Sequence, residues 1–308
     1  MQEDDRKTFL IAGGAGFLGR HLCRKILERR HKVICLDENP NWGIWDTDEA
    51  HYIHYVRDVV VDCYVQEHVD YVLNFASMAS PKDFLENPVK TLRSNAIGTH
   101  NLVLLTLANK ARFLLASSGQ VYGVNDATEP RAAYVEAKRY AEALTTAYQE
   151  RKGLDARIVR MWNTYGPGMR IMDGRVIPEF IRRAHYGLPI SIQGGNQAVS
   201  FTYVDDMIEG ILKVLYSDEI RPVDLGNHRL CQIGPQAKRI IQMMDSSSEL
   251  DIVPFHSREE SLPSLHLARN LGWSPQVEIE EGLKRTIADV SRRIKVGADH
   301  DGCREFNF

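Results

Sequence analysis

The 308-residue chain lacks the features that several classes of protein require. No apolar run reaches the length of a membrane-spanning helix, and the charged stretch from Met1 to Lys7 has no signal-peptide core. Lysine and arginine number 38 against 41 aspartate and glutamate, so the net charge of -3 gives no footprint for nucleic acid or an anionic membrane. We therefore expect neither nucleic acid nor a membrane among its partners.

Cysteine is scarce and dispersed. The five cysteines form no C-x-x-C pair, so we expect neither a disulfide framework nor a zinc site, and we predict no metal site at all. Dispersed thiols are typical of a reducing compartment, which predicts a cytoplasmic protein. Internal repeats and low-complexity tracts are absent as well. The 44% hydrophobic content is ordinary for a globular chain and suffices for one large domain or two closely joined ones.

A tyrosine and a lysine, Tyr134 and Lys138, stand four positions apart in the second quarter of the chain. On a helix these side chains share one face, and a nearby cation lowers the pKa of a phenol. A tyrosine tuned in this way can exchange a proton with a sugar hydroxyl, and Ser118, at the end of an apolar run, can hydrogen-bond the same oxygen. Such pairs also recur by chance on solvated helix faces, so the pattern gains weight only from its context. With that context, Ser118, Tyr134 and Lys138 are the candidate catalytic residues.

The context begins with an apolar run at 8–12 that leads directly into a turn containing Gly13, Gly16 and Gly19. A helical pattern and a second apolar run follow, closed by Asp37. Glycines let the backbone approach a pyrophosphate, a helix N-terminus supplies N–H groups, and the acid receives ribose hydroxyls. An acid at this position favours NAD over NADP. The predicted cofactor contacts in this segment are Gly13, Gly16, Phe17, Leu18 and Asp37.

Strand and helix patterns alternate as far as residue 161. This alternation predicts an α/β fold, with a Rossmann-type doubly wound parallel sheet. The main predicted elements are helices at 87–110 and 133–152, the first with Asn87 as N-cap, and strands at 71–77, 111–117 and 154–161.

From residue 163 the chain becomes richer in loops, glycine and proline, which predicts a smaller C-terminal α+β part for the substrate. We expect an NAD-binding domain at 7–162, a mainly substrate-binding part at 163–296 with some elements returning to the first domain, and a tail at 297–308.

The glycine spacing, G-x-x-G-x-x-G, resembles that of the short-chain dehydrogenase/reductase superfamily in its extended form. The resemblance implies that Asp58 and Val59 follow a strand and meet the adenine, and that Ala76 lies on the strand behind the cofactor. It also implies that Asn95 braces the active site, while Tyr134 and Lys138 contact the cofactor as well. From the residues alone, Asp58 fits a helix N-cap equally well, and Asn95 fits a solvated helix face.

Extended members of that superfamily pair through two helices, here those at 87–110 and 133–152, so the resemblance also implies a homodimer. Packing of both helices against their own sheet is the alternative. The apolar side chains available on them are Leu102, Leu104, Leu105, Leu107, Ala137, Tyr140, Ala141 and Leu144.

Within the extended group, residues 76–81, 87–92, 130–139 and 163–176 are similar to the UDP-glucuronate decarboxylase (UDP-xylose synthase) family. The resemblance spans about residues 7–295. It implies that a retained NAD oxidises the sugar C4 hydroxyl while Tyr134 takes the proton, that the 4-keto acid loses carbon dioxide, and that the hydride then returns. The substrate contacts that we predict are Ser80, Gln120, Asn163, Arg175, Val176 and Gln193.

The substrate half departs from that family. Where the family reads T-S-E-V-Y-G, Gln120 replaces the catalytic glutamate and cannot act as a base, and Gly119 replaces a hydroxyl. Gln193 stands where a tyrosine faces the uracil, and Val199 stands where an arginine holds the diphosphate. A second such arginine, from an R-x-P-D motif of the family, is missing in the stretch Ser261-Leu262-Pro263-Ser264.

Hydrogen bonds to charged groups contribute roughly 1.5–3 kcal/mol each, so the two missing arginines are costly. Nearby arginines either replace them or form a solvated basic face, and the sequence does not separate these alternatives. We expect UDP-glucuronate decarboxylation to be weak or absent. The arginines in question are Arg170, Arg175, Arg182 and Arg183.

Several functions remain open on this scaffold. The first is an enzyme that oxidises C4 of a nucleotide sugar, with decarboxylase ancestry or as a 4-epimerase or 4,6-dehydratase. Another is a net NAD dehydrogenase on a non-nucleotide sugar or polyol, which would explain the missing arginines. A non-catalytic NAD-binding module is disfavoured because Tyr134 and Lys138 are both present.

Overall fold

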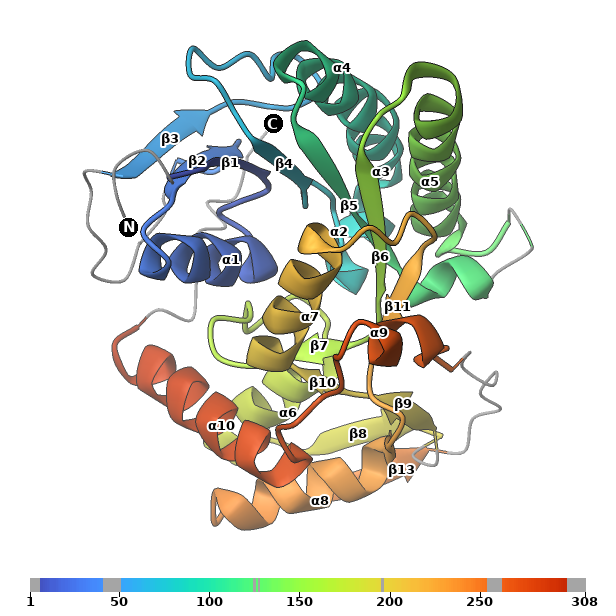
Figure 1. Ribbon diagram of the computed structural model, residues 1–308. Helices are drawn as coiled ribbons and strands as arrows, with labels where there is room; N and C mark the ends of the chain where they lie inside the picture. Colours follow the sequence, from blue (N-terminus) through green and yellow to red (C-terminus); the bar gives the residue numbers. More distant parts are fainter. Residues whose placement is uncertain are drawn as a thin grey trace.

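The computed structural model describes residues 6–40, 51–123, 126, 128–194, 197–253 and 262–297. Its main feature is a seven-stranded sheet in which every neighbouring pair is parallel, seen in the upper half of Figure 1. The winding reverses between β1 and β4, which is where sheets of this kind bind ligands. The strand order is β3 (Tyr52–Val56), β2 (Lys32–Asp37), β1 (Thr8–Ala12), β4 (Tyr71–Asn74), β5 (Arg112–Ser118), β6 (Ala156–Met161) and β11 (Val223–Leu225).

Both faces of the sheet are covered. Successive side chains of β1 enter different cores because side chains alternate along a strand. Phe9 and Ile11 join the cluster that includes α1 (Phe17–Glu28) and α7 (Val204–Tyr216), whereas Leu10 and Ala12 join the cluster of α4 (Thr99–Asn109) and α5 (Ala132–Lys152). Burial on both sides explains the uninterrupted apolar runs in the sequence. The predicted doubly wound sheet is confirmed.

The predicted helix at 87–110 consists of three segments: α3 (Pro88–Arg93), a π-turn η3 (Ser94–Gly98) and α4. It ends at Lys110, whose left-handed φ of 54° closes the last turn. An additional helix, α2 (Pro81–Glu86), precedes it and was not predicted. Asn87 lies at the expected N-cap position, but its side chain donates back to the carbonyl of Asp83 instead of capping α3.

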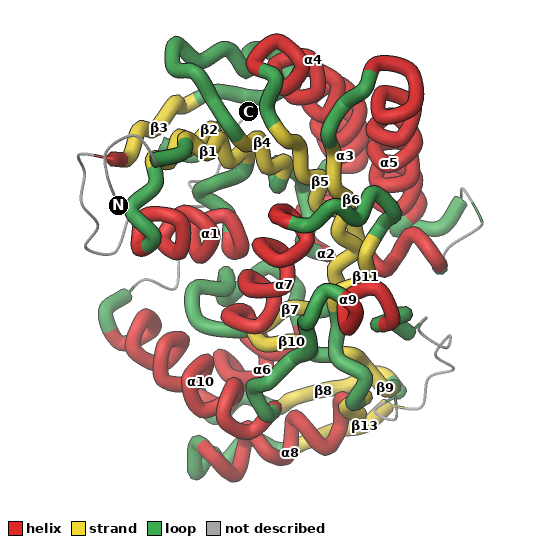
Figure 2. Tube along the Cα trace, viewed as in Figure 1, coloured by secondary structure: helices red, strands yellow, loops and turns green. Residues whose placement is uncertain are grey.

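The smaller part lies below the sheet in Figures 1 and 2. It contains helices α6 (Val176–His185), α8 (Ile233–Met243) and α10 (Ile279–Lys295), and the short helix α9 (His266–Asn270) contacts β11. None of the helices in the described ranges is long and apolar enough to cross a membrane. Three two-stranded sheets complete it: β7 (Thr164–Tyr165) with β10 (Thr202–Tyr203), β8 (Ile190–Gln193) with β13 (Leu250–Val253), and β9 (Ala198–Ser200) with β12 (Leu230–Gln232).

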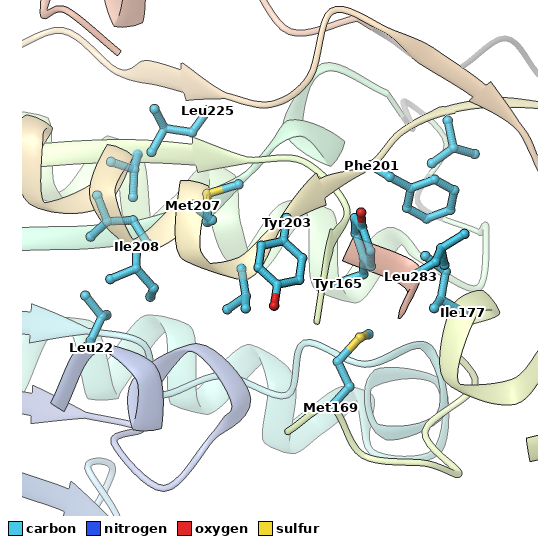
Figure 3. Close-up of a cluster of buried hydrophobic side chains, with 14 of the residues drawn as sticks. Leu22, Tyr165, Met169, Ile177, Phe201, Tyr203, Met207, Ile208, Leu225 and Leu283 are labelled. Atoms are coloured by element: carbon cyan, nitrogen blue, oxygen red, sulfur yellow. The ribbon is translucent and has the colours of Figure 1, made fainter. Parts of the chain in front are cut away.

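One apolar cluster joins the two parts. The ring of Tyr165 lies edge-on to Phe201 and Tyr203, with centroids 6.0 and 5.7 Å apart, and Leu22 of α1 and Leu283 of α10 belong to the same cluster (Figure 3). In addition, α7 packs on α1, and β11 extends the large sheet from beyond residue 163. This packing fixes α6 and the loop before it relative to the sheet, so residues from both parts can build one site. The proposed tail lies outside the described residues except for Gly297.

Candidate active site

The three candidate catalytic side chains lie together where β5 ends against α5. The Ser118 hydroxyl lies close enough to the Tyr134 phenol to lower its pKa. Lys138 Nζ lies 5.8 Å from the centroid of the Tyr134 ring and donates a 2.8 Å hydrogen bond to the carbonyl of Ala116. All three residues are at most 9% exposed. The spacing of Tyr134 and Lys138 places both on one face of α5, and the end of β5 places Ser118 beside them.

The two titrating groups are shifted mainly by burial. Burial raises the pKa of the Tyr134 phenol, while the Ser118 hydroxyl and the charge of Arg175 act in the opposite direction. The sequence predicted a lowered pKa for this phenol; the shift is in the opposite direction, because burial outweighs the groups that oppose it. Burial lowers the pKa of Lys138 itself to about 8, and the negative charge of Glu142 opposes that shift.

The unpredicted helix α2 covers the tyrosine. The ring of Phe84 stacks on Tyr134 with centroids 5.0 Å apart and planes inclined by 20°. Asp83 Oδ2 accepts a 2.6 Å hydrogen bond from Arg170, and the backbone N–H of Lys82 donates to the carbonyl of Asp173 at 3.3 Å. The loop at 166–175 therefore holds Phe84 over the phenol. No local pattern points to this contact, because it depends on how the loop packs on α2.

A short turn forms one wall beside Ser118. Ser118 Oγ accepts from the backbone N–H of Gln120 at 3.2 Å and so starts the 3-10 turn η4 (Gly119–Tyr122). Gln120 Oε1 is buried and has no hydrogen-bond partner among the described residues. The indole of Trp162 packs directly on Gly119, where an added β-carbon would lie 2.4 Å from Trp162 Cε2. The hydroxyl expected from the resemblance at position 119 therefore has no room here.

The glycine turn before α1 fits a dinucleotide. Gly13 has a left-handed φ of 76°, and a β-carbon there would lie 2.5 Å from the backbone of Phe75. A β-carbon on Gly19 would lie 2.2 Å from the carbonyl oxygen of Gly13. Gly16 occupies the N-cap, and Phe17 and Leu18 begin a first turn free of acidic residues, so its N–H groups and positive dipole end suit a pyrophosphate.

Asp37 stands beside this turn at the end of β2. Its carboxylate accepts hydrogen bonds from the backbone N–H groups of Ala15 at 3.0 Å and Asn39 at 2.9 Å. Burial raises its pKa, and these two bonds oppose the shift. The acid is thus fixed next to the glycine turn, as a contact with ribose hydroxyls requires.

The remaining predicted cofactor residues surround the ends of β3 and β4. Asp58 Oδ1 accepts from the N–H of Val60 at 2.8 Å and closes a turn, so the helix N-cap alternative is wrong. Val59 packs against Gly98 of the π-turn. Asn95, buried in the same turn, donates to Ser77 Oγ at 2.9 Å and to the carbonyl of Thr91 at 2.8 Å. Asn95 therefore braces the segment that follows β4, where Ala76 lies.

The predicted substrate residues are less concentrated. Ser80 is buried and caps α2 by accepting from the N–H of Asp83 at 3.2 Å. Arg175 lies close enough for its charge to act on Tyr134, and Val176 begins α6 directly after it. Asn163 is exposed after β6. Gln193 is exposed at the end of β8, in the smaller part.

The four arginines considered as diphosphate ligands are each ion-paired. Arg170 pairs with Asp83 at 2.6 Å, and Arg175 with the fully buried Asp173 at 2.9 Å. The other two, Arg182 and Arg183, pair with Glu179 at 2.9 and 2.7 Å. Within the described residues, no group of three or more His, Cys, Asp or Glu side chains is placed to hold a metal ion.

The sequence is related to a well-populated family. Residues 9–226 match the NAD dependent epimerase/dehydratase family. The chain is 37% identical to UDP-glucuronic acid decarboxylase 1 of Xenopus tropicalis, over 97% of this chain and 76% of that protein. It is 34% identical to UDP-glucuronic acid decarboxylase 6 of Arabidopsis thaliana, over 93% of this chain and 90% of that protein.

Solved structures share the fold. The UDP-glucose 4-epimerase of Thermotoga maritima, crystallised with UDP-glucose, superimposes with a TM-score of 0.83 at 23% identity, covering 93% of this chain and 99% of that one. The Thermus thermophilus UDP-glucose 4-epimerase, in complex with NAD, gives 0.81 at 23% identity, covering 92% and 98%. At this identity the likeness establishes the architecture.

Proposed function

Because the chain belongs to the NAD-dependent epimerase/dehydratase family, we propose that it oxidises the C4 hydroxyl of a nucleotide sugar with Tyr134 as the proton acceptor. The chain is an NAD-dependent enzyme that modifies nucleotide sugars, related to the UDP-glucuronic acid decarboxylases. The observation that carries the proposal is the burial of Ser118, Tyr134 and Lys138 in one place, with Lys138 Nζ 5.8 Å from the centroid of the Tyr134 ring.

Each protein group has a distinct role in this proposal. Gly13, Gly16 and Asp37 hold NAD, which when bound supplies the hydride acceptor and a positive ring. Ser118 and Tyr134 converge on one sugar oxygen, and Tyr134 takes its proton. The ammonium of Lys138, 5.8 Å from the ring centroid, favours the charged form of the phenol and opposes the effect of burial.

The step after C4 oxidation depends on Gln120. In the related decarboxylases a glutamate is expected at this position, and an amide cannot accept a proton at neutral pH. Gly119, packed under Trp162, carries no hydroxyl. These two residues are the reason to expect weak or absent decarboxylation of UDP-glucuronate. Oxidation at C4 is retained, because it requires only Ser118, Tyr134, Lys138 and NAD.

The test is to trap the C4 ketone. Purified protein is incubated with NAD and either a panel of UDP-, GDP- and dTDP-sugars, UDP-glucuronate included, or a panel of free sugars and polyols, and each reaction is quenched with sodium borodeuteride. We expect deuterium at C4 of at least one nucleotide sugar, and products analysed without the quench distinguish decarboxylation, epimerisation, dehydration and net oxidation. Deuterium in none of them, with free sugars and polyols oxidised instead, would overturn the proposal.

We also propose a homodimer formed by α3, η3, α4 and α5. Of the side chains offered by the sequence, Leu102, Ala137 and Ala141 are buried within the protomer. Leu104 and Tyr140 are 48% and 50% exposed. Val89, Leu92 and Ile97 are exposed as well, at intervals with Leu104 that fit one side of a helical run containing a π-turn. Light scattering at micromolar concentration tests this, and a monomer counts against it.

The compartment is a further part of the proposal. Cys23, Cys35, Cys63 and Cys231 are free thiols, and Cys303 lies outside the described residues. Free thiols fit a reducing compartment, which supports a cytoplasmic location. Localisation of a tagged chain by fluorescence microscopy tests it.

A further inference from the structure

Helix α5 carries a third functional group on the face of Tyr134 and Lys138. Glu142 stands one further turn along the helix, so the three residues follow at intervals of four. Each faces β5. Tyr134 lies beside Ser118, Lys138 donates to the carbonyl of Ala116 at 2.8 Å, and Glu142 Oε1 accepts from Ser117 Oγ at 2.5 Å.

The Glu142 carboxylate is fixed on its other side by Arg160. Arg160 donates from Nε to Oε1 at 2.9 Å and from an Nη to Oε2 at 2.6 Å, the two-pronged geometry that holds a carboxylate most firmly. Arg160 lies directly opposite Ser117 in the β5–β6 register. The side chains of Glu142 and Arg160 are only 11% and 20% exposed. Sheet register therefore places both partners of the carboxylate side by side.

Arg160 is in turn held by the neighbouring strand. Its remaining Nη donates to the Tyr122 hydroxyl at 2.6 Å, and that hydroxyl donates to Asp224 at 3.0 Å. Asp224 stands opposite Arg160 in the β6–β11 register. Arg160 thus bonds Glu142 directly on one side and is linked through Tyr122 to Asp224 on the other. The carboxylate is held in one place by groups that take no part in the proposed chemistry.

We propose that Glu142 is a positioning residue for the reaction: its carboxylate, clamped between Ser117 and Arg160, keeps Lys138 as an ammonium ion beneath Tyr134. The proposal rests on the function proposed above for Tyr134 and Lys138. A lysine that is 4% exposed loses most of its hydration, so its charged form needs a fixed negative charge nearby. Glu142 supplies that charge, and it opposes the effect of burial on the pKa of Lys138.

Other ionisable groups face the same region and are accounted for. Arg139 donates to the carbonyl of Val121 and to Glu136, so it is already bonded on the outer side of α5. Asp224 is separated from Glu142 by Arg160. Glu150 lines the same surface groove as Glu142 but is exposed. It provides a matched control, because it is a carboxylate on the same helix with water around it.

The test is a double-mutant cycle read by urea unfolding, which needs no substrate. Wild type, Glu142→Gln, Lys138→Met and the double variant are compared at pH 7 and pH 10. At pH 7 we expect Glu142→Gln to lower the unfolding midpoint more with Lys138 present than with methionine in its place. At pH 10, above the pKa of about 8, the two losses should agree. Equal losses at pH 7 would overturn the proposal.

A second variant keeps the test valid if Glu142→Gln does not fold. Ser117→Ala removes only the hydroxyl that fixes the carboxylate. At pH 7 it should also lower the unfolding midpoint more with Lys138 present than with methionine at position 138, but by a smaller margin than Glu142→Gln does. Glu150→Gln should show the same midpoint change in both backgrounds. A Ser117→Ala loss independent of Lys138, with Glu142→Gln unfolded, would also contradict the proposal.

Turnover measurements then separate this inference from the reaction assignment. In Glu142→Gln the alkaline limb of the pH profile of kcat should move to lower pH by about one unit, while KM for the sugar stays nearly unchanged. Glu150→Gln should keep the wild-type pH profile. An unmoved limb with an active enzyme contradicts the role of Glu142. If no sugar is turned over but the stability cycle shows coupling, the Glu142–Lys138 relation stands and the proposed reaction fails.

Discussion

The indole of Trp162 packs directly against the backbone of Gly119, beside Ser118: a β-carbon on Gly119 would lie 2.4 Å from Cε2 of the indole and 2.6 Å from Cδ2. The two residues lie on η4 and at the end of β6, and both are buried. The glycine therefore reflects the size of its neighbour, and the pair defines the wall next to the candidate catalytic serine.

Gly119→Ser should lower the free energy of unfolding by ~1–3 kcal/mol, because the indole cannot retreat from a filled core. Adding Trp162→Phe removes one ring and makes room, so the double variant should lose less stability than the two single losses summed. Urea unfolding measures this. Gly123→Ser, at the other end of the turn, is the control, since its β-carbon would meet its nearest neighbour at 3.4 Å. Additive losses would show that the pair is independent.

Tyr134→Phe should lower turnover by ~10²–10⁴-fold, since it removes only the hydroxyl that accepts the proton. The ring that stacks on Phe84 is retained, so folding and NAD binding should be nearly unchanged. Product formation and calorimetric titration with NAD measure the two effects. Tyr140→Phe, an exposed position on the same helix, is the control. Wild-type turnover in Tyr134→Phe would refute the role of the phenol.

Asp37→Ala should weaken NAD binding by roughly 10–100-fold, the equivalent of one charge-assisted hydrogen bond, and should relax rejection of NADP. The variant also loses the two hydrogen bonds that Asp37 accepts from Ala15 and Asn39. Asp37→Asn keeps one acceptor oxygen, so its NAD affinity should lie between those of wild type and Asp37→Ala. Calorimetry with both dinucleotides measures these affinities, and Glu28→Ala on the outer end of α1 is the control. Unchanged affinity in Asp37→Ala would show that another residue holds the ribose.

Stability should depend on pH through Lys138. Below pH 8 the lysine is protonated in both folded and unfolded states, and the cost of burying the charge is fully present. Between the folded pKa of about 8 and the unfolded value of 10.5, the unfolded chain binds the extra proton, so the folded state gains stability as pH rises. Relative to Lys138→Met, wild type should gain up to about 3 kcal/mol across this interval. If the difference in unfolding free energy between wild type and Lys138→Met does not change with pH, Lys138 is not a buried ammonium ion.

Gln120→Glu should increase the formation of UDP-xylose from UDP-glucuronate, because it restores a carboxylate next to Ser118. The wild-type protein should form little UDP-xylose. The assay is chromatography of nucleotide sugars with mass detection, and Gln242→Glu, an exposed position on α8, is the control. Efficient UDP-xylose formation by wild type would mean that Gln120 does not limit the step.

Local sequence pattern alone was enough to predict the order of the elements around the glycine turn and Asp37. The order of strand, glycine turn, helix, strand and acid from Thr8 to Asp37 is contiguous, and each element is specified by its own periodicity and turn chemistry. The i, i+4 spacing of Tyr134 and Lys138 likewise fixed a shared helix face, and continuing it to Glu142 would have found a further group. The helix–strand alternation was sufficient for the doubly wound sheet.

Only the tertiary structure decided the rest. Phe84 reaches Tyr134 through an unpredicted helix held by a loop more than 80 positions away, and Arg160 meets Glu142 because β6 pairs with β5 in one register. Trp162 meets Gly119 for the same reason. The sign of the pKa shift of Tyr134 also depended on folding, because burial there outweighs the nearby charges. Such contacts join residues far apart in the chain, and strand order, register and burial are set by packing of the whole molecule rather than by any local run of residues.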